Sequence, residues 1–386
     1  MNTYARQPVA FVRGAGVWLW DNEENRYLDG LSGIAVNTLG HAHPRLTKAL
    51  NEQIGKLIHC SNVYQVREQE LLADKLCSLS NMQEVFFSNS GCEANEAAIK
   101  LARLHGHGRG IESPAIIVME KSFHGRTLAT LSATGNRKVQ AGFEPLVTGF
   151  VRVPYDDLEA IRHVAQHNAN VVAVLVEPIQ GEGGICTPDV SYLQQLREIC
   201  TQHNWLLMLD EVQTGIGRTG KWFAHQHTGI LPDVMTLAKG LGSGVPIGAC
   251  LAAGPATGTF KPGNHGSTFG GNPLACVAGL TTLNVVEQDQ LLAHAAQLGQ
   301  FIRDGLTAAL QGVKGFNEVR GLGLIIGVEL DRPCGELVKQ ALARGLLINV
   351  TADNVVRLLP SLVMSQEEAQ QLLDILCPLI KEFLQS

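Results

Sequence analysis

The sequence lacks the features that would tie it to a membrane or to nucleic acid. Apolar runs such as Val171–Val176 are far too short to span a bilayer, and no apolar stretch of signal-peptide length precedes Asp21. Positive charge is not in surplus, because 30 lysines and arginines face 36 aspartates and glutamates, for a net charge of −6. We therefore expect no nucleic-acid partner and no membrane partner, and a cytoplasmic location.

The nine cysteines also lack the spacing of a disulfide framework or a zinc site. None stands in a Cys-x-x-Cys pair and their number is odd, which fits a reducing compartment. Three histidine doublets have no cluster of acids or cysteines beside them, so the sequence predicts no metal ion. The doublets are His41-Ala42-His43, His105-Gly106-His107 and His225-Gln226-His227.

Short apolar runs alternate with longer amphipathic segments through the middle of the chain. Runs such as Val171–Val176 are apolar at every position, which is typical of strands covered on both faces. The sequence therefore predicts an α/β fold with a mostly parallel sheet between helices. The expected strands are Glu84–Phe87, Ala115–Met119, Val171–Val176, Trp205–Leu209, Val234–Leu237 and Ala249–Ala253, and the expected helices between them are Glu93–Leu104, Leu158–His167 and Tyr192–Gln202.

No repeat, charge block or Pro/Ser-rich hinge divides the 386 residues, so the domain division depends on the pattern of elements. We expect a large α/β domain over residues 60–275 and a smaller C-terminal α+β domain over 276–386. Residues 1–59 are expected to pack with the smaller domain. Its last helix is predicted over about residues 366–383, with Pro378 bending or breaking it.

An acid and a lysine each follow a buried strand, where parallel sheets place their functional groups. These residues are Asp210 and Lys239. A desolvated lysine can condense with a carbonyl, and pyridoxal phosphate needs such a lysine together with a carboxylate against its pyridine nitrogen. The plainer alternatives are an aspartate that caps a loop and a solvated lysine, and a phosphate site would make these alternatives weaker.

Such a site is present where Asn89–Ala98 follows one strand and opens a helix, because free backbone N–H groups at a helix start bind phosphate. The alternative is an ordinary serine N-cap. The segment Gly215–Gly220 matches the dinucleotide pattern Gly-x-Gly-x-x-Gly. It lacks the strand immediately before it and the packed helix after it, so an NAD-dependent oxidoreductase is only a remote alternative.

Five ordered motifs resemble those of the class III (fold type I) pyridoxal-phosphate-dependent aminotransferases, most closely the members that act on N2-acetylornithine. The likeness runs from Asp21 to Pro360. The motifs are Ser90-Gly91-Cys92-Glu93-Ala94-Asn95-Glu96, Phe123-His124-Gly125-Arg126-Thr127, Leu209-Asp210-Glu211-Val212-Gln213-Thr214-Gly215-Ile216-Gly217-Arg218, Leu237-Ala238-Lys239-Gly240 and Gly266-Ser267-Thr268-Phe269-Gly270-Gly271-Asn272-Pro273.

The resemblance implies a large domain with a sheet of the seven-stranded type and a homodimer with shared active sites. It implies that Lys239 carries the cofactor imine and moves the proton, and that Asp210 pairs with the pyridine nitrogen. Thr268 is expected to reach the phosphate bound by the neighbouring subunit. The implied cofactor contacts are Gly91, Cys92, Phe123, Asp210, Glu211, Val212, Gln213, Lys239 and Thr268.

For substrates, the resemblance implies that Arg126 and Ser267 hold the donor carboxylate. It also implies that Arg357 holds the α-carboxylate of glutamate or 2-oxoglutarate, and that Glu182 neutralises Arg357 while the ω-amino donor is bound. The implied reaction moves the δ-amino group of N2-acetyl-L-ornithine to 2-oxoglutarate in arginine biosynthesis. Ile34 stands where ornithine-specific relatives carry tyrosine, which disfavours free ornithine. The alternative donors are 4-aminobutyrate and succinylornithine.

Overall fold

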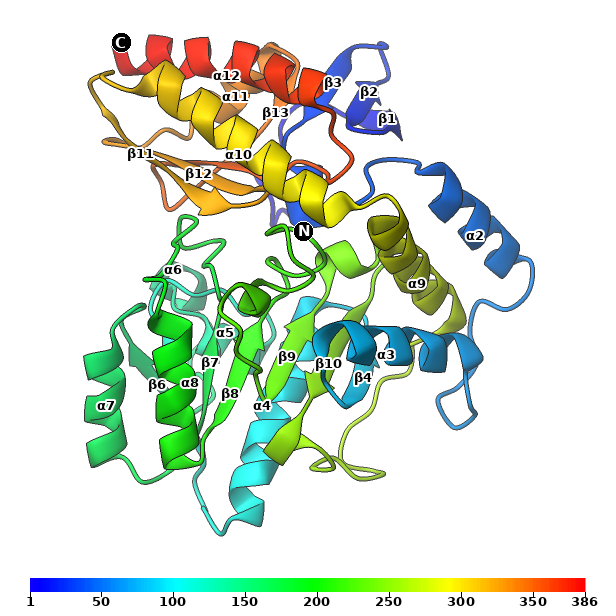
Figure 1. The fold of residues 1–386 in the computed structure, drawn as a ribbon, viewed down its shortest axis with the longest axis vertical. Helices are drawn as coiled ribbons and strands as arrows, with labels where there is room; N and C mark the ends of the chain where they lie inside the picture. The colour runs from blue at the N-terminus through cyan, green and yellow to red at the C-terminus, as the bar shows by residue number, and fades with distance from the viewer. Residues whose placement is uncertain (386) are drawn as a thin grey trace.

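The computed structural model describes residues 1–385 and contains a seven-stranded sheet between layers of helices (Figure 1). The strand order is β4-β10-β9-β8-β7-β5-β6. Only β10 runs antiparallel to its neighbours, so the predicted mostly parallel sheet is confirmed. The strands are β4 (Glu84–Ser88), β5 (Ala115–Met119), β6 (Phe150–Val153), β7 (Val171–Val176), β8 (Leu206–Asp210), β9 (Val234–Leu237) and β10 (Gly248–Ala252).

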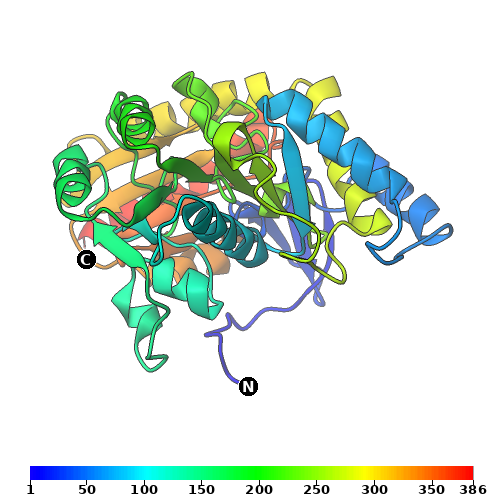
Figure 2. The same ribbon diagram turned by 90° about the horizontal axis from the view of Figure 1, so that it is seen from below.

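Successive residues of one strand enter different cores, which explains why these strands are apolar throughout. Leu206 and Met208 pack with α4 (Gly91–Gly108), whereas Leu207 and Leu209 pack with α8 (Tyr192–His203). Figure 2 shows α4 on one face of the sheet, with α7 (Leu158–His167) and α8 on the other. Small residues such as Ala98 let α4 lie close to the strands. The edge strand β6 was not predicted from the sequence.

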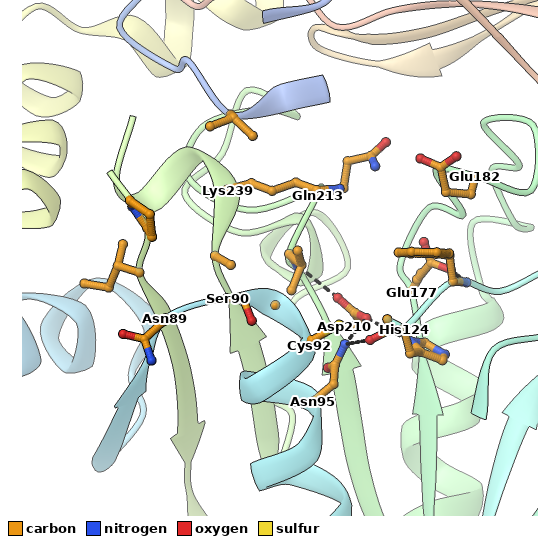
Figure 3. Close-up of a pocket in the computed structure, with 18 of the residues that line it drawn as sticks. Asn89, Ser90, Cys92, Asn95, His124, Glu177, Glu182, Asp210, Gln213 and Lys239 are labelled. Carbon is orange, nitrogen blue, oxygen red and sulfur yellow. Dashed lines mark hydrogen bonds and ion pairs between the residues drawn. The ribbon is translucent and has the colours of Figure 1, made fainter. Parts of the chain in front are cut away.

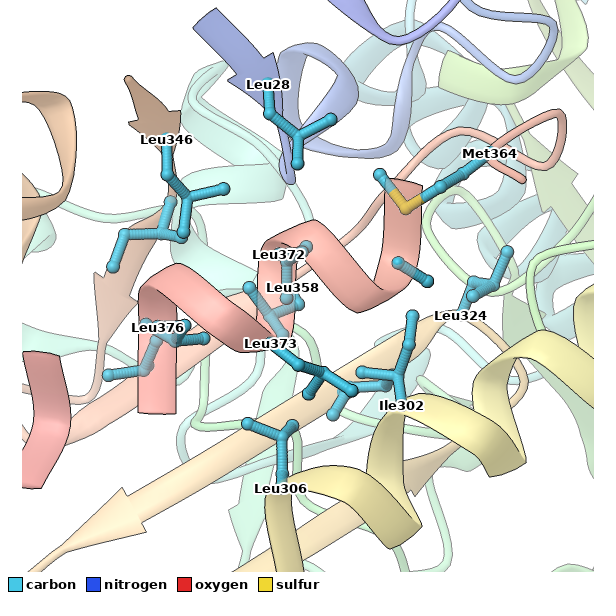
Figure 4. Close-up of a cluster of buried hydrophobic side chains, with 14 of the residues drawn as sticks. Leu28, Ile302, Leu306, Leu324, Leu346, Leu358, Met364, Leu372, Leu373 and Leu376 are labelled. Carbon is cyan, nitrogen blue, oxygen red and sulfur yellow. The ribbon is translucent and has the colours of Figure 1, made fainter. Parts of the chain in front are cut away.

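A second layer stands over the carboxyl ends of β8 and β9 (Figure 1). Its antiparallel sheet has the order β11-β12-β15-β14, and helices cover its outer side. Figure 4 shows the core between them, where Ile302 and Leu306 meet Leu372 and Leu373. The helices and strands of this last part of the chain are α9 (Pro273–Gln288), α10 (Leu291–Leu310), β11 (Phe316–Leu322), β12 (Ile325–Leu330), α11 (Leu337–Ala343), β13 (Leu346–Leu347), β14 (Asn349–Thr351), β15 (Val355–Leu358) and α12 (Gln366–Gln385).

Pro378 lies inside α12, which continues to Gln385, so the helix is not broken at this proline, and a bend there stays a prediction. The ring costs one backbone hydrogen bond, and the buried side chains of Leu376 and Leu379 on either side of it keep the helix packed.

The first part of the chain forms a sheet with a late strand. In it β1 (Phe11–Ala15), β2 (Trp18–Asp21) and β3 (Arg26–Asp29) are antiparallel, and β13 pairs in parallel with β3. The domain boundaries at residues 59 and 275 stay a prediction. The remaining helices are α1 (Ser32–Ala35), α2 (Pro44–Ile54), α3 (Arg67–Ser80), α5 (Leu128–Ala133) and α6 (Arg137–Gln140).

Candidate active site

A cavity of about 370 Å³ lies at the carboxyl ends of the large sheet's strands (Figure 3). Residues after β4, β5, β7, β8 and β9 all reach it, as expected for a parallel sheet. Val36, which directly follows the α1 turn, also lines the cavity. Most of the predicted site residues line it, namely Gly91, Cys92, Phe123, Glu182, Asp210, Val212, Gln213 and Lys239.

Lys239 follows β9 at the start of a short 3-10 turn, with a φ of 40°. A lysine rarely adopts this left-handed conformation, so the surrounding structure holds it there. The hydroxyl of Thr38 donates to the carbonyl of Gly240 at 3.1 Å and fixes the next residue. Burial lowers the pKa of Lys239, although the carboxylate of Glu182 opposes this effect. A lowered pKa leaves more of the amine in its nucleophilic form.

Asp210 ends β8 and is only 4% exposed. Three donors hold its carboxylate: Asn95 Nδ2 at 2.8 Å, His124 Nδ1 at 2.8 Å and the backbone N–H of Val212 at 3.0 Å. Figure 3 shows Asp210 joined to Asn95 and His124. Thr236 donates to Asn95 Oδ1 at 2.8 Å, which fixes the orientation of that amide. The carboxylate is therefore rigid and stabilised as an anion facing the cavity.

Asn95 and His124 were not predicted as site residues, although they lie in two of the five motifs. Asn95 stands one helical turn after Gly91, on the same side of α4. That spacing was available as a signal, because a residue four positions beyond a phosphate-binding glycine faces the same site.

The start of α4 presents backbone N–H groups to the cavity. Ser90 caps the helix, its Oγ accepting from the N–H of Glu93 at 3.2 Å. A side chain on Gly91 would come within 2.8 Å of Val212, so glycine is required for this close approach. The Sγ of Cys92 accepts from the backbone N–H of Arg126 at 3.0 Å. The side chain of Cys92 thus supports the loop after β5. Its backbone N–H group is therefore the part of Cys92 that is available to bind an anion at the start of the helix.

An ion pair lies on the far wall of the cavity. Arg357, on β15, is 1% exposed, and its Nη1 lies 2.6 Å from Glu182 Oε1. Arg357 Nε donates to Asn349 Oδ1 at 3.0 Å, and Nη1 approaches Gln213 Oε1 at 3.5 Å. Burial opposes the ionisation of Glu182, but the charge and hydrogen bond of Arg357 outweigh it and lower the pKa of Glu182. The carboxyl group of Glu182 is therefore ionised at neutral pH.

A further carboxyl group near the site, that of Glu177, was not predicted from the sequence. It is buried at the end of β7, with Oε1 2.9 Å from the N–H of Phe123 and Oε2 3.1 Å from the N–H of Gly181. Burial raises its pKa to about 7, opposed by His124. This one side chain joins the loop that carries Phe123 to the loop that carries Glu182.

Five expected site residues do not line this cavity: Arg357, which lies behind Glu182 and Gln213, and Glu211, Arg126, Ser267 and Thr268. The carboxylate of Glu211 accepts from Thr214, from His225 Nδ1 and from the backbone N–H of Ala224 and His225, so it anchors a turn behind the site. Arg126 and Thr268 are exposed, and Ser267 accepts hydrogen bonds from Asn89 and from Gly270.

The comparison with known families gives a match along nearly the whole chain. The family described as aminotransferase class-III matches residues 2–380. The chain belongs to the class-III aminotransferases. The family resemblance read from the five motifs is thereby confirmed. Class-III aminotransferases use pyridoxal phosphate, so this protein is a pyridoxal-phosphate-dependent transaminase.

Individual relatives agree over full length. The chain is 63% identical to an acetylornithine aminotransferase of Nitrosomonas europaea, covering 100% of this chain and 98% of that protein. An acetylornithine aminotransferase of Aquifex aeolicus is 48% identical, over 97% of this chain and 98% of that protein. Among solved structures, an ornithine aminotransferase of Toxoplasma gondii has a TM-score of 0.96 at 34% identity, over 99% of this chain and 92% of that one. An acetylornithine aminotransferase of Elizabethkingia anophelis has a TM-score of 0.88 at 37% identity, over 99% and 96%.

The residues of this class-III aminotransferase fit the cofactor. The cavity holds a buried lysine with a lowered pKa, a rigid carboxylate and a free helix start. The alternative nucleotide segment, Gly215–Gly220, is followed by the short 3-10 turn Ala224–His227 and not by the packed helix that a dinucleotide site needs. Within residues 1–385, no helix combines the length and apolar character needed to cross a membrane.

Proposed function

We propose that this enzyme transfers the δ-amino group of N2-acetyl-L-ornithine to 2-oxoglutarate, giving N-acetyl-L-glutamate 5-semialdehyde and L-glutamate. The observation that carries the proposal is the ion pair between Glu182 and Arg357 next to Lys239. The chain is also 63% identical to a protein named acetylornithine aminotransferase. While Glu182 pairs with Arg357, the site can accept a donor whose reacting amine lies far from its carboxylate. Once Glu182 has moved away, Arg357 can bind the α-carboxylate of the second substrate.

Lys239 and Asp210 carry the chemistry in this proposal. Bound pyridoxal phosphate supplies a ring that draws electrons from the substrate carbon as its proton leaves. Lys239 Nζ would hold the cofactor through an imine until the amine of the substrate displaces it. The freed amine would then take the proton from the carbon bearing the substrate nitrogen and later return one. Asp210, held by three donors, keeps the ring nitrogen protonated.

The other proposed cofactor contacts position the ring and its phosphate. Gly91 and Cys92 offer backbone N–H groups to the phosphate at the start of α4. Phe123 and Val212 pack on the two faces of the ring, and Gln213 lies near its phenolic oxygen. All five line the cavity.

Substrate selection is proposed to depend on two arginines. Arg126, with Ser267 nearby, holds the α-carboxylate of acetylornithine, and Arg357 holds that of glutamate or 2-oxoglutarate after Glu182 has moved away. Ile34 lies in the α1 turn, where residues 32–35 all have positive φ values. It offers no hydroxyl for the free α-amine of ornithine. The second candidate donors are 4-aminobutyrate and succinylornithine, since they present the same ω-amine.

The proposal includes a cytoplasmic homodimer, in which Thr268 of one subunit reaches the phosphate in the other. An exposed apolar segment supports it: Val63 is 79% exposed and Tyr64 71%. Asn62 in the same segment donates to the carbonyls of Ser267 and Gly270 at 3.0 Å, so this surface adjoins the loop of Thr268. Sedimentation of the holoenzyme tests the dimer, and a monomer with full activity would refute the shared site.

The deciding experiment follows the cofactor absorbance of the holoenzyme as single amino donors are added without a keto acid. N2-acetylornithine, ornithine, succinylornithine and 4-aminobutyrate are compared. We expect acetylornithine to convert the cofactor fastest and ornithine and 4-aminobutyrate to be slow. Faster conversion by 4-aminobutyrate would overturn the proposed substrate while leaving the family assignment intact.

A further inference from the structure

A second cavity, of about 880 Å³, lies directly behind Glu182. Glu182 and Phe123 line both cavities and so form the wall between them. The Glu182 side chain is 36% exposed, whereas that of its partner Arg357 is 1% exposed. The arginine is sealed in β15 and also bonded to Asn349. The pair can therefore open only if the carboxylate moves. The first cavity is the one proposed to hold the cofactor and substrate, so the second cavity is the space left for the displaced carboxylate.

The second cavity contains more positive than negative charge once Glu182 is set aside. Arg320 is paired with Glu318 at 2.6 Å and with Glu329, and Lys138 with Asp353 at 3.4 Å. Two lining cations, Lys121 and Arg137, form no ion pair within 4 Å among the residues that the structure describes, although the charge of Lys121 contributes to lowering the pKa of Glu329. One positive charge is therefore in excess, which one more carboxylate would neutralise.

Among the lining cations without an ion pair, Lys121 is the one whose backbone lies against the Glu182 loop. Its carbonyl lies 2.9 Å from the position that a side chain on Gly183 would occupy. Arg320 donates to the carbonyls of Gly184 and Ile185, so the far end of the loop is fixed. Thr351 donates to the carbonyl of Glu182 and fixes the near end. The backbone therefore stays in place while the Glu182 side chain rotates.

We propose that Lys121 is a positioning residue that receives the carboxylate of Glu182 when Arg357 binds the α-carboxylate of glutamate or 2-oxoglutarate. The inference rests on the proposed function, because that function requires Glu182 to leave Arg357 in one half-reaction and stay in the other. A displaced carboxylate without a partner would oppose the exchange. An ammonium in the receiving cavity lowers that cost in the glutamate half-reaction alone.

The test compares Lys121→Gln and Lys121→Glu with Lys138→Gln, a matched control on the same cavity whose side chain is 82% exposed. Glutarate, an unreactive dicarboxylate, is titrated into each holoenzyme by calorimetry. We expect Kd to rise about threefold for Lys121→Gln and about tenfold for Lys121→Glu, and to stay within about twofold for the control. In single-turnover assays, kcat/KM should fall by the same factors for glutamate and not for acetylornithine.

The same titrations in a Glu182→Gln background separate this role from general attraction of anions. Without a carboxylate to receive, the Lys121 substitutions should no longer change glutarate affinity, which is the coupling that a double-mutant cycle measures. If the Lys121 substitutions change glutarate affinity equally with and without Glu182, or change it in neither case, the inference is overturned. The proposed function would still stand if the unmodified holoenzyme completes both half-reactions. Failure of glutamate to react with the unmodified holoenzyme would instead overturn the proposed function, and the role of Lys121 with it.

Discussion

Replacing Glu177 by glutamine should change how the stability of the protein depends on pH. The carboxylate is buried and accepts from the N–H groups of Phe123 and Gly181 at 2.9 and 3.1 Å. Glu177→Gln keeps the shape and one acceptor but places an NH2 group where the second acceptor stood. The variant therefore loses one backbone hydrogen bond at every pH, and it also loses the titration of the carboxyl group.

The size of the pH effect follows from the shift. Burial raises the pKa of Glu177 from 4.5 to about 7 in the native protein. The unfolded chain thus loses its proton first, and the free energy of unfolding falls as the pH rises from about 4.5 to 7. A shift of this size at about 1.4 kcal/mol per pKa unit amounts to about 3 kcal/mol. Glutamine has no such dependence, so the variant gains about 3 kcal/mol relative to the unmodified protein over this range.

Denaturant unfolding of both proteins between pH 5 and 8 measures this difference, because all other titrating groups are common to them. Glu182→Gln is the matched control. The pKa of Glu182 is lowered in the native protein, so this carboxyl is ionised in both states across the same range and its profile should run parallel to that of the unmodified protein. If the free energies of unfolding of Glu177→Gln and the unmodified protein differ by the same amount at every pH from 5 to 8, the reasoning is refuted.

Three further outcomes are expected. Lys239→Ala should abolish amino transfer while the circular dichroism spectrum stays unchanged, and near-normal turnover would contradict the assignment of the lysine. Asn95→Ala removes a charge-assisted hydrogen bond to Asp210 and should weaken cofactor binding about ten- to hundredfold, measured as the Kd of pyridoxal phosphate. Gly125→Ala should destabilise the protein by about 2 kcal/mol or more, because φ is 141° and the new Cβ would lie 2.4 Å from Cys92 Sγ. Adding Cys92→Ala should recover part of the lost thermal midpoint.

The strands that end at the site could be predicted from the sequence because short, fully apolar runs are typical of strands buried on both faces. Val171–Val176 is buried at all positions, and the polar residues that follow β8 and β9 stand out against such runs. Asp210 and Lys239 could therefore be chosen from position and chemistry together. The edge strand β6 is only partly buried and gives a weaker pattern.

Side-chain direction could not be predicted in the same way. Glu211 follows Asp210 directly, yet the two carboxylates face opposite ways, and that of Glu211 binds the 224–225 turn. The Sγ of Cys92 turns towards the backbone of Arg126, a residue far from it in sequence. Pro378 stays inside α12 because tertiary packing outweighs a local preference. Each outcome depends on contacts between segments that the sequence does not place side by side.

The pairing of β3 with β13 has a consequence for the order in which the chain is made. Leu28 lies beside Leu346 in a parallel pair, so the first sheet keeps an open edge until about 320 further residues have left the ribosome. At about 5–20 residues per second this takes roughly 15–60 s. During that time the unpaired N–H and C=O groups of β3 can join another strand. The order of synthesis thus leaves this edge of the three-stranded N-terminal sheet exposed until β13 has been made.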